Sequence, residues 1–550
     1  MSSSSHRSAR GSVSEKAQHG IAYSYGSTFE DEIRAAAPSL RGRRLTAALA
    51  FVAGTGFTLF GYDQGVMSAL LTANQFDKVF PQVAIGDNHA TLQSFLVAIY
   101  EIGCLFGALS NLWLGDKLGR RKTIFIGGSI MIVGAILQTT SFTYAQMIVA
   151  RIITGLGNGL NTSTVPTYHA ECSPAAKRGS FIMVEGSLIT FDADTAQIHF
   201  AFYWLTGSSA QWRVPIAFQI VLALMMIVGV MFLPESPRWL AKHGREAEAL
   251  AIISALENKD YTDESVQLTY HAIRETIAAE HSNSSSDRSA LREIFTNSRS
   301  QNFRRASLGV INQCFQQISG INIITYYATI LFQRLGLNDV NSRIIAAANG
   351  TEYFLASIIA IFLIDRIGRR KLMLFGSVGQ TLTMVLLAVL GSINTPGCQV
   401  ASCVLLFVFN SFFAVGWLGM TWLYPAEIVG LKIRAPANAF STASNWIFNF
   451  VVVMVTGPSF NDISWRTYIV FAALNAFIIP IVYFFFPETA GRSLEDMDVI
   501  FAIAYNESVS PVAVSLRKNV PPAGSPEADE ILGISPRSND GEVLEERNKE

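Results

Sequence analysis

Long apolar stretches separated by short polar turns dominate the chain between residues 45 and 499. Each stretch holds about twenty residues, enough for a helix to cross the hydrocarbon core of a bilayer. These windows begin near Leu45, Leu92, Thr123, Ala145, Phe181 and Val214 and, after a polar interval, near Ala306, Arg343, Leu372, Ser402, Pro436 and Arg466. The pattern predicts an all-α membrane protein with twelve transmembrane helices, six on either side of the interval.

The polar intervals divide the chain into five parts. Residues 1–44 are Ser-rich, lack the apolar core of a cleaved signal peptide, and are predicted to form a disordered cytoplasmic tail. Residues 489–550 are rich in Ser, Pro and acidic side chains and are predicted to be a mostly disordered cytoplasmic segment. Between them we expect a six-helix bundle at 45–233, a linker with short amphipathic helices at 234–305, and a second six-helix bundle at 306–488.

Basic residues cluster in alternate loops. Lys117, Arg120 and Arg121 lie between spans two and three, and Arg366 and Arg369 lie between spans eight and nine. By the positive-inside rule these loops, the linker and both termini are cytoplasmic, and the chain is a multi-pass protein of the cell membrane.

Composition narrows the class of partner. Half of the residues are hydrophobic, 15% are charged and the mean hydropathy is +0.32, which fits a protein embedded in a lipid bilayer. The formal net charge of -1 gives no basic surface for nucleic acid. The five cysteines have no metal-ligand spacing, and no phosphate-binding loop, zinc motif or nucleophile elbow is found in the sequence. We therefore expect no metal, no cofactor and no enzymatic activity.

An internal repeat relates the two bundles. The segment 115–122 returns as 364–371, in both cases after the second span of its half. Glu171 and Glu427 follow the fourth and tenth spans, and the Pro-Glu pairs at 234–235 and 487–488 follow the sixth and twelfth. Such duplication predicts two pseudo-symmetric halves that rock against each other around a central pathway.

Charged residues inside the apolar windows are candidate functional groups, because each is costly in hydrocarbon unless it faces a cavity or a partner. Asp63 lies in the first span and Arg151 in the fourth. An ion pair between them would lower the cost of burying either charge. Protonation of Asp63 would weaken that pair and bias a two-state carrier. The alternative is a permanent ion pair that only locks two helices. Glu101, in the second span, is either a structural carboxylate or a second proton site.

The ordered motifs of the chain resemble those of the sugar porter family of the major facilitator superfamily, especially its fungal members. They are residues 61–65 (GYDQG), the paired Gly-Arg-Arg loops, residues 234–238 (PESPR), residues 316–322 (QQISGIN) and residues 487–489 (PET). The resemblance covers about Leu45 to Val499 and implies the major facilitator fold, with a sugar or polyol and a proton as transported partners.

The resemblance also implies a sugar site. Side-chain amides bond sugar hydroxyls in both directions, and an aromatic ring covers the apolar face of the sugar. The matching positions are Gln316, Gln317, Asn322, Trp422, Asn445, Trp446 and Asn449, with Tyr326 and Tyr327 similar to an outer gate. Gln316 and Asn322 do not share a face of one continuous helix, but Gly320 could break the helix and turn both inward. Packing is the alternative role for each tryptophan, and it is as plausible as sugar binding for Trp446.

Charged residues at repeated cytoplasmic positions resemble the inner gate of the family. Their salt bridges are expected to hold the halves together when the site faces outward and to part when it opens inward. The set comprises Asp116, Arg120, Arg121, Glu171, Arg178, Glu235, Arg238, Asp365, Arg369, Arg370, Glu427, Arg434 and Glu488.

The fifth span departs from the family pattern. Asp192, Asp194 and His199 lie where an apolar, Gly-rich run is expected. Because such residues are costly in a membrane, the usual sugar contact from this helix is in doubt, and transport itself could be altered or lost.

The sequence as a whole predicts a secondary active transporter, a functional monomer that takes up a monosaccharide, preferably a hexose, with one proton by alternating access. Polyol, glycerol or disaccharide symport is the nearest alternative. A nutrient sensor that binds sugar without moving it is a third reading, because one fold can host different functions.

Overall fold

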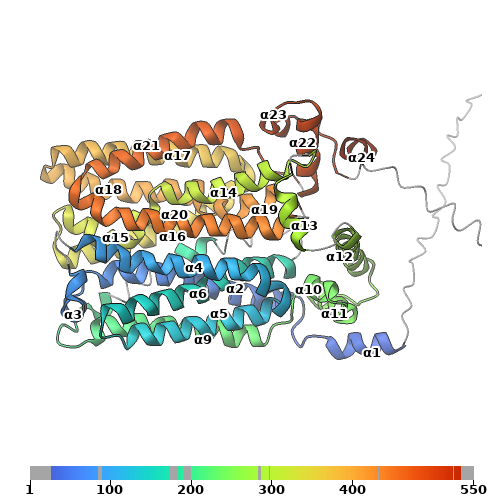
Figure 1. Ribbon diagram of the computed structural model, residues 1–550, viewed down its shortest axis with the longest axis horizontal. Coiled ribbons are helices and arrows are strands. Elements are labelled where there is room, and N and C mark those ends of the chain that lie inside the picture. The colour runs from blue at the N-terminus through green and yellow to red at the C-terminus, as the bar shows by residue number, and fades with distance from the viewer. Residues whose placement is uncertain are drawn as a thin grey trace, which may run out of the picture.

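The computed structural model describes residues 27–84, 89–173, 184, 186–190, 198, 200–282, 287–296, 298–430, 433–492, 494–523 and 525–533. Across these residues every regular element is a helix. Figure 1 shows two bundles of long, roughly parallel helices lying side by side, with shorter helices gathered at one end. The all-α prediction is confirmed.

The first bundle contains α2 (Gly42–Leu70), α4 (Ala90–Leu118), α5 (Arg120–Thr139), α6 (Tyr144–Cys172) and α9 (Ala210–Met231). The second bundle contains α14 (Asn302–Ile318), α15 (Ile321–Arg334), α16 (Asp339–Ile367), α17 (Arg369–Ile393), α18 (Pro396–Phe413), the π-helix η4 (Ala414–Leu418), α19 (Met420–Ile428), α20 (Arg434–Asp462) and α21 (Arg466–Phe485). Helix α4 packs against α20, and α2 against α15, where the two bundles meet (Figure 1).

Nine helices in the described part of the chain are long and apolar enough to cross a membrane. Helix α6 and the broken α14–α15 pair fall short of that criterion by length or composition. Most of the predicted fifth span, including Asp192, Asp194 and His199, lies outside the described residues. The described part therefore agrees with the predicted arrangement without supplying the full count of twelve.

The shorter helices lie at one end of the bundles, which we call the linker end (Figure 1). They are α1 (Ser27–Ala36), α10 (Pro237–Lys242), α11 (Glu246–Glu257), α12 (Glu264–Ser282), α13 (Asp287–Ile294), α22 (Leu494–Asn506), α23 (Pro511–Ser515) and α24 (Pro526–Leu532). The opposite end, called the far end, carries α3 (Asn74–Val79) and η1 (Pro81–Val83).

Both terminal segments contain more structure than the sequence analysis predicted. Within the N-terminal tail, α1 packs Ile33 into a small cluster with residues of α11 and α12. Within the C-terminal segment, α22–α24 share a core that includes Phe501 and Val514, and Asp498 binds Arg305 at 2.6 Å. The prediction of disorder was wrong for these helices because their few apolar residues are enough to cover one another when docked on a larger body.

Closely spaced glycines fix α4 against α6. A Cβ at Gly155 would lie 2.2 Å from the Tyr100 carbonyl oxygen, and one at Gly159 would lie 2.1 Å from that of Cys104. Gly103 and Gly107 of α4 approach the α6 backbone just as closely. Small residues at such spacing let membrane helices approach to backbone contact. This contact places Tyr100 and Glu101 of α4 beside Arg151 of α6.

Candidate functional site

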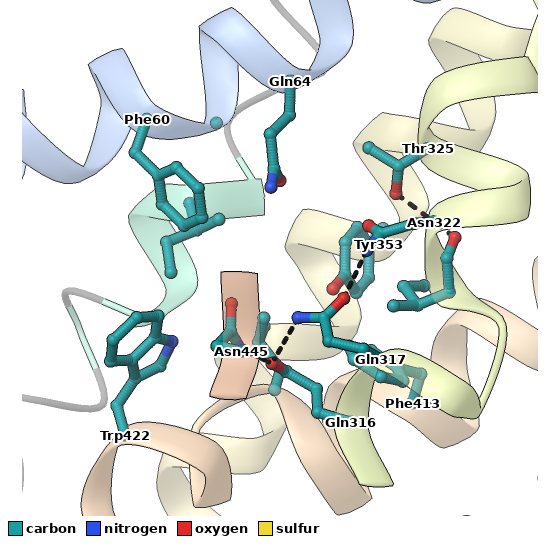
Figure 2. Close-up of a pocket in the computed structure, with 14 residues that line it drawn as sticks. Phe60, Gln64, Gln316, Gln317, Asn322, Thr325, Tyr353, Phe413, Trp422 and Asn445 are labelled. Atoms are coloured by element: carbon teal, nitrogen blue, oxygen red, sulfur yellow. Dashed lines mark hydrogen bonds between the residues drawn. The ribbon is translucent and has the colours of Figure 1, made fainter. Parts of the chain in front are cut away.

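A pocket lies between the two bundles, enclosing about 490 Å³ of space that is partly open to solvent. Figure 2 shows Phe60 and Gln64 of α2 on one side and the amide side chains of the second bundle on the other. Its lining residues come from both bundles and comprise Phe60, Gly61, Gln64, Ile189, Gln316, Gln317, Ile321, Asn322, Thr325, Tyr353, Phe413, Leu418, Trp422 and Asn445.

Two helix irregularities shape this pocket. Gly320 adopts φ +93°, a conformation that favours glycine, and separates α14 from α15. The predicted break at Gly320 is thereby confirmed, and it brings Gln316 and Asn322 to the same pocket. The π-helix η4 interrupts the tenth span and presents Leu418 to the pocket, in keeping with the frequent occurrence of π-bulges at functional sites.

Side-chain amides form a connected network along one wall of the pocket (Figure 2). Asn445 Nδ2 donates to Gln316 Oε1 at 2.9 Å, and Gln317 Nε2 donates to the same oxygen at 3.1 Å. Asn322 Nδ2 donates to Gln317 Oε1, and Asn445 Nδ2 also bonds Gln313 at 2.6 Å. These amides hold one another in place and can exchange their mutual bonds for bonds to hydroxyls.

The two tryptophans occupy different positions. Trp422 lines the pocket and packs edge-on against Phe57, with ring centroids 6.4 Å apart. Trp446 is fully buried behind the pocket wall, where it packs edge-on against Phe60 at 5.4 Å. Asn449 also lies behind the wall and reaches the pocket only through Asn322, whose Nδ2 donates to Asn449 Oδ1 at 2.5 Å. Of the seven predicted sugar ligands, Trp446 and Asn449 therefore do not line the pocket.

Asp63 and Arg151 meet inside the first bundle. Arg151 Nη1 donates to Asp63 Oδ1 at 3.2 Å, and both side chains are fully buried. Arg151 also donates to the Val97 carbonyl at 3.0 Å and lies 4.5 Å from the centre of the Tyr100 ring. Asp63 immediately precedes Gln64 on α2, and Gln64 lines the pocket, whereas the Asp63 side chain points into the first bundle.

Hydrogen bonds from α15 to α4 connect the two bundles. The Tyr326 hydroxyl donates to Glu101 Oε1, and the Tyr327 hydroxyl lies 3.0 Å from Ser94 Oγ. The chain direction of α15 places both tyrosines on the far-end side of Asn322. The tyrosines predicted as an outer gate therefore join the bundles next to the pocket.

The charged motifs at the linker end are arranged alike in the two halves. Arg120 binds Glu171 at 3.0 Å in the first half, and Arg369 binds Glu427 at 2.9 Å in the second. Glu235 accepts from the backbone N–H groups of Arg120 and Arg121, and Glu488 accepts from those of Arg369 and Arg370. Each carboxylate thus caps the first turn of a helix, where negative charge is favourable. Two further ion pairs involve residues of these motifs, Asp116 with Lys242 and Asp365 with Arg369.

These ion pairs differ from the predicted inner gate in one respect. Each pair described between members of the predicted set joins residues of the same half, so it braces that half and does not bridge the two. Arg178 lies outside the described residues. Arg434 donates to the Val429 carbonyl at 3.4 Å, also within its own half. Arg238 lies in the first turn of the linker helix α10 and makes further contacts.

Sequence reasoning missed several residues of the pocket. Phe60, Thr325 and Phe413 look like ordinary core or turn residues in the sequence, and only the helix rotation turns them inward. Gln64 adjoins Asp63 in the GYDQG motif, which was the one signal that could have identified it.

Comparisons with known proteins show the family of this chain. A family model described as "Sugar (and other) transporter" matches residues 49–501. The chain is 40% identical over 499 residues to Sugar transporter STL1 of Saccharomyces cerevisiae, covering 86% of this chain and 84% of that protein. It is also 40% identical over 467 residues to MFS-type transporter oryC of Aspergillus oryzae, covering 84% and 86%.

The fold has solved counterparts. A structure of XylE, a proton:xylose symporter of the major facilitator superfamily bound to 6-bromo-6-deoxy-D-glucose, matches with a TM-score of 0.71. The sequence identity is 24%, and the match covers 83% of this chain and 99% of that one. This likeness establishes the helical arrangement described above.

Proposed function

This chain belongs to the sugar transporter family of the major facilitator superfamily, a family of carriers rather than enzymes, and from that premise we propose that it takes up a hexose together with a proton. The observation that carries the proposal is that α2 contributes Asp63 to a buried ion pair with Arg151 and Gln64 to a pocket lined with amides. A proton and a polar solute would thus bind at adjacent places in one protein.

The pocket chemistry supports a small, hydroxyl-rich substrate. Gln316, Gln317, Asn322 and Asn445 offer both donors and acceptors, and Trp422 with Phe60 offers apolar surface on the opposite side. Because a sugar ring has hydroxyls at its rim and apolar C–H faces, both kinds of wall would be used. The mutual amide bonds would be replaced by bonds to the sugar, at little net cost.

The ion pair supplies the means of coupling. An intramembrane carboxylate that binds a proton loses most of its attraction for arginine, so protonation would free Arg151 and loosen α2 from α6. A ligand shifts a conformational equilibrium only through its different affinity for the two states, and the proton would meet that condition here. The charge-bracing clusters around Arg120 and Arg369 would keep each half rigid while the halves rock.

Orientation follows from the basic loops. They support an orientation with the linker end in the cytoplasm and the far end outside. Tyr326 and Tyr327 would then close the outer path in the state described here, by bonding to Glu101 and Ser94 of the other half. Opening to the outside would require both contacts to part.

The test is uptake of radiolabelled hexose in cells that lack their own hexose carriers, with external pH recorded. We expect accumulation accompanied by alkalinisation of the medium, and competition by hexoses that exceeds competition by glycerol, linear polyols or disaccharides. Stronger competition by a polyol or disaccharide would reassign the substrate. Sugar binding without flux would instead identify a sensor.

A further inference from the structure

Glu101 is a buried carboxylate that the pairing of Asp63 with Arg151 leaves unexplained. It lies in α4 with no exposed surface, and its Oε2 has no hydrogen-bond partner among the described residues. Its Oε1 accepts from the hydroxyl of Tyr326, which belongs to the other half. A charged group in such a place is costly unless something compensates it.

The charges around Glu101 do not balance. Arg151 and Asp63 both lie near enough to act on it, and Arg151 is already bound to Asp63 at 3.2 Å. The other groups close to it in the described structure, Tyr100, Cys104, Tyr326 and Asn449, are neutral. Two carboxylates therefore share one guanidinium, and one bound proton would make the cluster neutral.

Glu101 also lies where the proton site meets the sugar site. Asn449 of α20 is close to the Glu101 carboxylate and accepts from Asn322 Nδ2 at 2.5 Å. The Nδ2 of Asn449 itself has no hydrogen-bond partner among the described residues. Asn322 lines the pocket and donates to Gln317. Neighbouring polar side chains thus lead from the ion pair past Glu101 and Asn449 to the amide wall.

We propose that Glu101 is a second proton-binding residue of the transport cycle, whose protonation depends on its contacts with Tyr326 and Asn449 across the two halves. The inference rests on the proposed function, because it assumes a proton-coupled cycle. When α4 and α15 part, Glu101 loses the Tyr326 bond and meets water, so its affinity for a proton changes with conformation. That difference between states is what coupling requires.

The experiment measures hexose uptake from about pH 5 to about pH 8, the range in which carboxylates with a shifted proton affinity titrate. It compares cells that express the wild type, Glu101→Gln or Glu352→Gln at matched levels in the membrane. Glu352 is the control, a part-buried carboxylate of α16 that is bound to Ser411 away from this cluster. Glutamine keeps the size of the side chain and an acceptor for Tyr326, but does not titrate. We expect the ratio of uptake at about pH 5 to uptake at about pH 8 to fall about threefold or more in Glu101→Gln. Glu352→Gln should keep the wild-type ratio.

A wild-type pH profile in correctly inserted Glu101→Gln would overturn the inference while leaving the symport proposal intact. A wild type that takes up sugar with no response to pH would overturn both. If Glu101→Gln does not reach the membrane, Tyr326→Phe decides the question, because it keeps the carboxyl and removes only the hydroxyl that stabilises its charged form. We expect the pH at half-maximal uptake to rise in Tyr326→Phe, and an unchanged value would count against Glu101.

Discussion

The two halves of this transporter share a fold and the same linker-end motifs but differ in the chemistry at the centre of the membrane. The first half buries charges, with Asp63, Glu101 and Arg151 held between α2, α4 and α6. The second half buries neutral amides, with Gln316 and Asn445 among them, along α14 and α20. Under the proposed function, proton binding and sugar binding would fall to different halves, and coupling would have to pass through the contact between them.

The largest effect is expected from the first half. Asp63→Asn removes the charge that holds Arg151, and it leaves a side chain that does not take up a proton at physiological pH. We expect accumulation of sugar against its gradient to be abolished while exchange of labelled for unlabelled sugar continues, because the amide wall is untouched. Unchanged accumulation in this variant would remove Asp63 from the proton pathway.

The converse effect is expected from the second half. Gln316→Ala deletes the oxygen that accepts from both Gln317 and Asn445, so Gln317 loses its acceptor and Asn445 keeps only Gln313. We expect sugar affinity to weaken by about 1–3 kcal/mol, the usual cost of an unmatched buried polar group. The ratio of protons to sugar moved at saturating sugar should stay at the wild-type value. Loss of coupling in Gln316→Ala would show that the two functions are not divided between the halves.

The smallest effects distinguish the pocket wall from the layer behind it. Trp422→Ala removes a lining surface and should weaken affinity by about 1 kcal/mol or more, as expected for a buried aromatic contact. Trp446→Phe keeps the packing against Phe60 and should change affinity by less than about 0.5 kcal/mol, as is usual away from a binding site. Binding of radiolabelled sugar, measured by isotope dilution so that it does not depend on tryptophan fluorescence, distinguishes the two variants. A larger loss in Trp446→Phe would mean that the pocket is placed wrongly.

Much of the fold could be predicted because it depends on local patterns. Apolar windows of membrane-spanning length located the helices, and the repeated segments 115–122 and 364–371 disclosed the two halves. Burying Asp63 and Arg151 as separate charges within a membrane would be costly in free energy, which was enough to predict that the two side chains meet. Gly320 could be recognised as a break because few other residues adopt its conformation.

The remaining features depend on how helices rotate and dock, which a single sequence does not encode locally. The family resemblance implies that both Trp422 and Trp446 bind the sugar, yet the rotation of α19 and α20 turns one inward and the other away. The bond between Glu101 and Tyr326 joins residues far apart in the chain. The linker-end ion pairs form at residues that the sequence singled out, but each joins residues of one half, Glu171 with Arg120 and Glu427 with Arg369.

Accumulation driven by a proton gradient alone tests the central claim most directly. Purified protein in sealed liposomes would be given labelled hexose outside, either with an acidic exterior or with equal pH on both sides and no other ion gradient. The account predicts that internal sugar rises above the external concentration only with the acidic exterior, and that Asp63→Asn only equilibrates under both conditions. Equilibration without concentration by the wild type in the acidic exterior would contradict it.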